Sequence, residues 1–188
     1  MFECFAEVQP VLFKCKNNSD HLLNPNKTMK RTIAIVAGGD SSEHDVSLRS
    51  AEGILSFMDT EKYDCYVVEM KGTDWKALYK DEVCPIDRND FSFTAKDGRH
   101  TFDFAYITIH GTPGENGILQ GYFDLIGMPY STSDVLVESL TFNKYALNNF
   151  LRSNPDLNIS ESVLLRKDQI DMSDKDIIAR VGLPCFVK

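Results

Sequence analysis

The sequence predicts an α/β protein with a mostly parallel sheet flanked by helices. Apolar, strand-like runs alternate with segments of helical periodicity along the first part of the chain. A glycine-rich turn follows two of these runs, and 43% of the 188 residues are hydrophobic while 26% are charged, which is typical of a folded globular chain. Strands that alternate with helices pair in parallel and bury their faces under those helices.

The expected elements follow in order. Residues 32–37 form an apolar strand that runs into Gly38-Gly39, and residues 42–58 have helical spacing with Ser41 or Ser42 as the expected N-cap. The remaining elements of this part are strands at 63–70 and 104–109, a helix at 118–126, and a hairpin-like region at 82–102 with a turn at Asp97-Gly98.

A boundary is expected near residues 131–134. Beyond it, apolar residues predict two helices that separate near 141–143, a strand-like segment at 159–165 and a short helix at 174–180. The predicted organisation is therefore an irregular extension at 1–28, an amino-terminal α/β domain at 29–131 and a second unit at 132–188. Because Met29 directly precedes the first strand, we expect translation to begin there.

Composition narrows the classes of function. The net charge of −8 and the pI of about 5.0 argue against a nucleic-acid partner, which needs a basic patch. No apolar run approaches the ~20 residues that cross a bilayer, so no membrane association is expected. The five cysteines are odd in number and form no Cys-x-x-Cys pair, which predicts reduced thiols in a cytoplasmic protein and no metal site.

The most informative motif is His110-Gly-Thr-Pro-Gly-Glu-Asn-Gly-Ile-Leu-Gln-Gly121, which follows the last predicted strand of the domain. Ligands of open α/β sheets bind at the carboxyl ends of strands. The imidazole of His110 can donate to a carboxylate or phosphoryl oxygen there, or relay a proton near neutral pH. The alternative is a structural histidine that only makes hydrogen bonds within the protein.

The second motif is Gly38-Gly-Asp-Ser-Ser-Glu-His-Asp-Val-Ser47, between the first strand and the first helix. The carboxylate of Glu43 can pair with an ammonium group of a ligand, or stabilise the first helical turn by about 0.3–1 kcal/mol; both roles can hold at once. This turn argues against a dinucleotide-binding dehydrogenase, because the turn carries an acidic residue at the place where the pyrophosphate of the dinucleotide would lie.

Both motifs, with Met128-Pro-Tyr-Ser-Thr-Ser133 and Ser139-Leu-Thr-Phe-Asn-Lys144 after them, resemble the D-alanine:D-alanine ligases of the ATP-grasp superfamily over about residues 29–188. This resemblance implies a Rossmann-like, pre-ATP-grasp domain followed by an incomplete ATP-grasp subdomain. It also implies ATP-dependent, ADP-forming ligation of two D-alanines through an acyl phosphate, for peptidoglycan precursor synthesis, in a cytoplasmic homodimer.

The resemblance implies roles for individual residues as well. Glu43 binds the amino group of the first D-alanine and His110 holds its carboxylate, which makes them the expected catalytic residues. Val46 packs on the methyl group and Ser47 supports the turn. We hypothesise that Glu115 orients the ring of His110.

Nucleotide binding is implied for Lys144 and for Lys188, which ends a segment that resembles a strand, Val181-Gly-Leu-Pro-Cys-Phe-Val-Lys188. The family's ligands for Mg2+ (or Mn2+) lie beyond this point, so the chain is expected to be a fragment without ligase activity of its own. Two alternatives stay open: a non-catalytic truncated binding or dimerisation module, and a ligase that joins D-alanine to D-lactate or D-serine.

Overall fold

The computed structural model describes residues 30–168 and 172–187 and contains one seven-stranded sheet. The strands lie in the order β6-β5-β4-β3-β2-β1-β7. Their bounds are β1 (Arg31–Gly38), β2 (Tyr63–Lys71), β3 (Asp74–Tyr79), β4 (Glu82–Asp87), β5 (Ser92–Ala95), β6 (Gly98–His100) and β7 (Phe104–Ile107).

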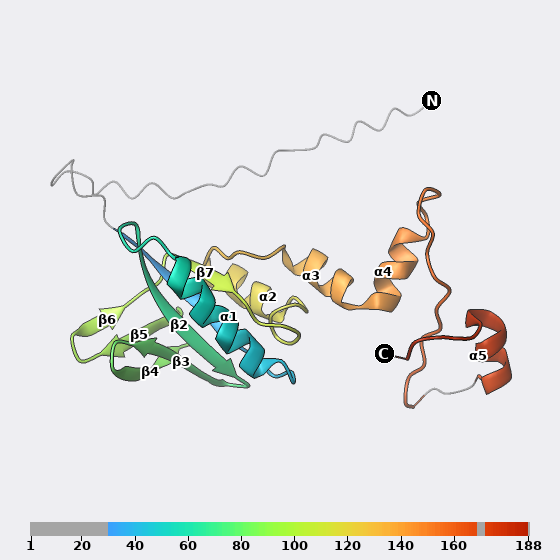
Figure 1. Cartoon of the computed structure of the whole chain (residues 1–188), viewed down its shortest axis with the longest axis horizontal. Coiled ribbons are helices and arrows are strands. Elements are labelled where there is room, and N and C mark those ends of the chain that lie inside the picture. The colour runs from blue at the N-terminus through green and yellow to red at the C-terminus, as the bar shows by residue number, and fades with distance from the viewer. Residues whose placement is uncertain (1–29, 169–171, 188) are drawn as a thin grey trace, which may run out of the picture.

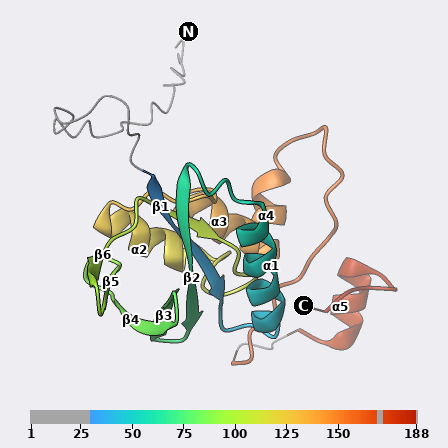
Figure 2. The ribbon, with the colours of Figure 1, turned by 60° about the vertical axis from the view of Figure 1, so that its left-hand side comes forward.

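The centre of the sheet is parallel and covered on both faces. β1 pairs in parallel with β2 and with β7. Alternate residues of β1 point to opposite sides: Ile35 packs with Ala51 of α1 (His44–Phe57), whereas Val36 belongs to the same core cluster as Phe123 of α2 (Ile118–Ile126). Figure 2 shows the two helices on opposite sides of these strands. The predicted α/β class is thus confirmed.

The outer strands differ from the expected parallel order. β2 to β6 are joined antiparallel, with two-residue turns at Gly72-Thr73, Lys80-Asp81 and Lys96-Asp97. Parallel neighbours need a crossover of a dozen or more residues, which these short connections do not supply. The mostly parallel arrangement therefore holds for β2, β1 and β7 alone. The predicted hairpin over 82–102 is present, whereas β3 was not predicted.

Aromatic side chains fill the space under the curled outer strands. Phe91 and Phe93 are almost completely buried, and Phe91 contacts Phe123 of α2 with ring centroids 5.0 Å apart. Buried aromatic pairs of this kind contribute about 0.5–1.5 kcal/mol each beyond their buried area. This core fixes α2, and with it the loop that precedes α2, against the sheet.

After α2, the chain passes beside β7 and then leaves the sheet. Ala105 and Tyr130 form a parallel bridge, and the Ser131 hydroxyl accepts a hydrogen bond from the Ile107 amide at 2.9 Å. Three helices follow: α3 (Val135–Phe142), α4 (Lys144–Leu151) and α5 (Asp174–Val181). The side chains of Asp134, Asn143 and Ser173 cap them. The predicted break between two helices is confirmed, at Asn143. Figure 1 shows α4 and α5 away from the sheet.

Two predicted strands of the second unit are not formed. Residues 159–165 and 182–187 are irregular. A strand is stabilised by hydrogen bonds to a neighbouring strand, and within 30–168 and 172–187 no strand lies beside either segment. The extension at 1–28, the expected start at Met29 and Lys188, which is expected to bind the nucleotide, lie outside the described residues. Among the helices of the described ranges, none has both the length and the hydropathy needed to span a membrane.

Candidate active site

Two loops meet at the carboxyl ends of β1 and β7. The first joins β1 to α1 (residues 39–43), and the second is the glycine-rich loop (residues 110–117). The amide of Asp40 donates to the carbonyl of Thr112 at 2.9 Å, and the hydroxyl of Ser41 donates to the carbonyl of His110 at 2.8 Å. The two motifs that are about 70 residues apart in sequence therefore form one local structure.

The hydroxyl of Ser41 connects the two predicted catalytic positions. It accepts a hydrogen bond from the amide of Glu43 at 3.1 Å while it donates to the carbonyl of His110. Glu43 itself is the N-cap of α1 and makes no side-chain cap bond, so the predicted capping by Ser41 or Ser42 was wrong. The Ser41 hydroxyl accepts from the amide of Glu43, which precedes α1, rather than from an amide of the first turn. Glu43 and His110 are both exposed, so their side chains are accessible to a ligand.

Ser47 lies beneath the first loop and is completely buried. Its hydroxyl accepts from the amide of Gly38 and donates to the carbonyl of Thr108, both at 2.9 Å. The hydroxyl thus joins the end of β1 to the residue that follows β7. A buried hydroxyl with both bonds satisfied fixes this geometry, because loss of either partner costs about 1–3 kcal/mol.

Glycine is required where the loops touch. Gly39 has φ +93°, and a Cβ there would lie 2.5 Å from Cγ2 of Ile109. A Cβ on Gly114 would lie 2.6 Å from Cβ of the same isoleucine. Both loops therefore pack directly onto Ile109, which leaves no room for a side chain.

Glu115 supports the backbone of the glycine-rich loop. Its Oε2 accepts from the amide of Gly111 at 2.7 Å. The expected contact is with the imidazole of His110, whereas in the described residues the hydrogen bond is made to the amide of Gly111, which follows His110. The side chain of Glu115 can reach the amide of Gly111 because these two residues are four positions apart in a tight loop.

Gln120 was missed by sequence reasoning, although it lies within the glycine motif. The side chain is completely buried, and its Nε2 donates to the carbonyl of Gly114 at 2.6 Å and to Oγ1 of Thr132 at 2.8 Å. Its Oε1 has no hydrogen-bond partner among the residues that the structure describes. A buried amide at this position links the glycine-rich loop to the segment that leads into α3. The signal in the sequence was a polar residue on the apolar face of α2.

His44 was also missed. Its Nδ1 lies 2.9 Å from the carbonyl oxygen of Gly39, and its Nε2 lies 3.3 Å from Oε1 of Glu69 on β2. The available signal was its position directly after Glu43.

The remaining predicted residues lie on helices. Val46 is on the first turn of α1 and is 42% exposed, so its side chain is available beside the two loops. Lys144 begins α4, where its Nζ donates to the carbonyl of Thr141 at 2.7 Å. The structure thus places Glu43, Val46 and His110 in one region, and Lys144 beyond α3.

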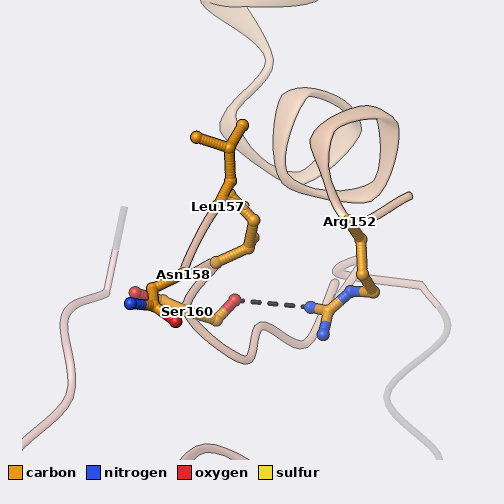
Figure 3. Close-up of a pocket in the computed structure, with 5 residues that line it drawn as sticks. Arg152, Leu157, Asn158 and Ser160 are labelled. Carbon is orange, nitrogen blue, oxygen red and sulfur yellow. Dashed lines mark hydrogen bonds between the residues drawn. The ribbon is translucent and has the colours of Figure 1, made fainter. Parts of the chain in front are cut away.

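A separate hollow of about 450 Å³ lies next to α4 (Figure 3). The guanidinium of Arg152 donates to the carbonyl of Ser160 at 3.4 Å across it and pairs with Glu161 at 2.5 Å. None of the predicted site residues lines this hollow. Among residues 30–168 and 172–187, no three histidine, cysteine or acidic side chains are grouped to hold a metal ion.

Comparison with known proteins agrees with this arrangement. A family model described as "D-ala D-ala ligase N-terminus" matches residues 32–133. The chain is 58% identical over 161 residues to a protein of Phocaeicola vulgatus named D-alanine–D-alanine ligase, which covers 85% of this chain and 49% of that protein. The chain thus spans about half the length of such curated relatives.

Solved structures show the same fold. D-alanyl-alanine synthetase A of Vibrio cholerae superposes with a TM-score of 0.65 at 29% identity, covering 77% of this chain and 43% of that one. The VanG D-Ala:D-Ser ligase of Enterococcus faecalis superposes with a TM-score of 0.63 at 26% identity, covering 74% of this chain and 46% of that one. With the family match over 32–133, these similarities show that the chain belongs to the D-alanine–D-alanine ligase family and contains its amino-terminal region.

Proposed function

We propose that this chain supplies the part of an ATP-dependent, ADP-forming D-alanine–D-alanine ligase that binds the first D-alanine. The observation that carries the proposal is the Ser41 hydroxyl, which holds the Glu43 and His110 backbones together at the carboxyl ends of the central strands. This is the position where open α/β sheets bind their ligands.

The two exposed side chains have complementary chemistry for an amino acid zwitterion. The carboxylate of Glu43 accepts charge-assisted hydrogen bonds from the ammonium group, and the imidazole of His110 donates to the carboxylate. Val46, half-exposed on the first turn of α1, packs on the methyl group. Ser47 and Glu115 hold the two loops from below and from within.

The reaction proceeds in two steps. The carboxylate of the first D-alanine attacks the γ-phosphorus of ATP, which forms an acyl phosphate and releases ADP. The amine of the second D-alanine then attacks the acyl carbon, the peptide bond forms, and phosphate leaves with the bonding electron pair while the amine loses its protons. The residues of this chain contribute by positioning the first D-alanine for both steps.

Lys144 and Lys188 are proposed to contact the nucleotide. Mg2+ or Mn2+, when bound in the complete enzyme, would neutralise charge on the phosphoryl group being transferred. We also propose that residues 29–131 form the substrate domain, that residues 132–188 begin the ATP-grasp domain, and that the enzyme is a cytoplasmic homodimer in peptidoglycan precursor synthesis.

Binding of D-alanine to the 188-residue chain is the direct test. In an NMR titration of 15N-labelled protein, D-alanine is expected to shift the amides of residues 39–47 and 110–115, with L-alanine as the matched control. Glu43→Gln is expected to abolish the shifts. If D-alanine leaves both loops unshifted, the assignment of the first-substrate site is wrong. ADP release measured in the same samples tests the expectation that the chain alone lacks ligase activity.

Activity is tested in a chimera. Residues 30–187 of this chain replace the matching segment of the Phocaeicola vulgatus relative, whose 58% identity favours compatible packing. D-alanine-dependent ADP release by the chimera supports the proposal, and Glu43→Gln in the chimera is the control. The alternative is a ligase that joins D-alanine to D-lactate or D-serine, since this chain also superposes on the Enterococcus faecalis D-Ala:D-Ser ligase.

A further inference from the structure

His44 occupies a space that a glycine leaves open at the end of β1. A Cβ on Gly38 would lie 2.9 Å from Cε1 and 3.1 Å from Nδ1 of the imidazole. The ring therefore packs against the backbone of the Gly38-Gly39 turn, and its side chain is only 18% exposed. Any residue larger than glycine at position 38 would displace it.

Both ring nitrogens face acceptors from other elements. Nδ1 lies 2.9 Å from the carbonyl oxygen of Gly39, and Nε2 lies 3.3 Å from Oε1 of Glu69, near the carboxyl end of β2. A carbonyl and an ionised carboxylate can only accept hydrogen bonds. Each ring nitrogen that carries a proton therefore has an acceptor in reach. The ring thus joins three elements: the end of β1, the start of α1 and the end of β2.

The backbone on either side of this contact carries Glu43. The amide of Gly39 donates to the carbonyl of Met70 at 2.8 Å, so the turn is attached to β2 by its amide, while its carbonyl oxygen faces the His44 ring. Glu43 directly precedes His44, and its amide bonds to Ser41. A shift of the imidazole would thus move the backbone from which the Glu43 carboxylate projects.

We propose that His44 is a positioning residue, which holds the β1–α1 turn between Gly39 and Glu69 so that Glu43 meets the ammonium group of the substrate. This inference rests on the proposed function, in which Glu43 binds that group. Both ring nitrogens are occupied by protein acceptors, so His44 acts through Glu43 and makes no contact with the substrate itself.

The first test separates a positioning role from a loss of folding. We compare binding of D-alanine with binding of propionate, which keeps the carboxylate and the carbon chain but lacks the ammonium group. His44→Ala is expected to weaken D-alanine binding about tenfold and to leave propionate binding unchanged, since only the ammonium contact depends on Glu43. His44→Asn, whose amide nitrogen can donate to the Gly39 carbonyl, is expected to recover much of the loss.

The matched control is Asp45→Ala, an exposed residue in the same helical turn. It is expected to leave the preference for D-alanine over propionate unchanged. Equal weakening of both ligands by His44→Ala, or the same loss of preference in Asp45→Ala, would overturn the inference.

A second measurement needs no ligand and so separates this inference from the proposed function. In hydrogen exchange, His44→Ala is expected to speed exchange of the hydrogen-bonded amides of Gly39, Asp40 and Glu43 about tenfold, while the amide of Ala34 within β1 is unaffected. Unchanged exchange at the three loop amides would refute the positioning role. If the wild-type chain binds no D-alanine, the proposed function fails, and the exchange rates still decide whether His44 holds the turn.

Discussion

The hydroxyl of Ser41 donates to the carbonyl oxygen of His110 at 2.8 Å, although 69 positions separate the two residues in the sequence. The hydroxyl oxygen of Ser41 also accepts a hydrogen bond from the amide of Glu43. One side-chain atom thus sets the spacing between the backbones that carry the two proposed substrate-binding groups. A serine that a sequence pattern suggests as a helix cap has a larger role as a bridge between loops.

Ser41→Ala is expected to weaken D-alanine binding by roughly fivefold to tenfold and to lower the free energy of unfolding by about 1 kcal/mol, because the His110 carbonyl and the Glu43 amide each lose a partner. Calorimetric titration and urea unfolding measure the two effects. The control is Ser42→Ala, a change at the exposed neighbouring residue. Equal effects of both changes would show that the bridge has no special role.

Replacement of glycine by alanine is expected to change the stability of the chain in opposite directions at two positions. Gly39→Ala is expected to destabilise the chain by more than about 1 kcal/mol, since alanine is strained at φ +93° and its Cβ would overlap Ile109. Gly53→Ala, within α1, meets nothing within 4 Å and is expected to stabilise by about 0.5–1 kcal/mol. Thermal unfolding of the two variants should move the midpoint in opposite directions; a rise for Gly39→Ala would contradict the packing described for the loop.

Glu115 offers a test of how the glycine-rich loop is held. Its Oε2 accepts from the Gly111 amide, and a glutamine oxygen can accept the same bond. Glu115→Gln is therefore expected to retain most of the affinity for D-alanine, whereas Glu115→Ala is expected to lose about tenfold. If Glu115→Gln were as damaging as Glu115→Ala, the negative charge would matter, as in our original hypothesis of a contact with the His110 ring.

Acid stability should depend on Asp97. Hydrogen bonds from Lys80, His100 and Tyr79 hold the pKa of its carboxyl well below the usual range. The folded pKa lies below the unfolded value of about 3.9, so the stabilisation is present above pH ~4 and is lost as the pH falls below it. Urea unfolding at pH 5 and pH 3 should show a smaller loss for Asp97→Asn than for the wild-type chain. An equal loss in both proteins would show that other carboxyl groups control the acid transition.

The sequence predicted the central strands and both flanking helices because their apolar spacing reflects burial on one or two faces. The helix at 118–126 matches its predicted bounds. β3 was not predicted, although Trp75, Ala77 and Tyr79 have the alternating spacing of a strand, because its pairing with β2 and β4 is a tertiary property. The segment 159–165 has strand composition, but a strand also needs a partner, which composition does not specify.

The two site loops were predicted as loops of one site, yet their contacts were not. Glycine spacing indicates a tight turn, but it does not show that Gly39 and Gly114 both pack on Ile109. The side chains of Ser41 and Glu115 bond to backbone groups. Every residue has such groups, so the identity of a residue does not show that its backbone is a partner. His44 was overlooked for the same reason: one of its partners is a carbonyl oxygen.

The difference between hairpins and parallel pairing has a consequence for the order of folding. β2 to β6 contact their neighbours through turns of a few residues, so this part can form early at a small cost in loop closure. β1 pairs with β7, with Ile33 opposite Phe104, only when the long loop formed by the intervening chain closes. The Ser41–His110 contact depends on that late pairing. A folding intermediate that contains only the hairpins would therefore lack affinity for D-alanine, and recovery of binding in a refolding experiment is expected to follow the slowest phase.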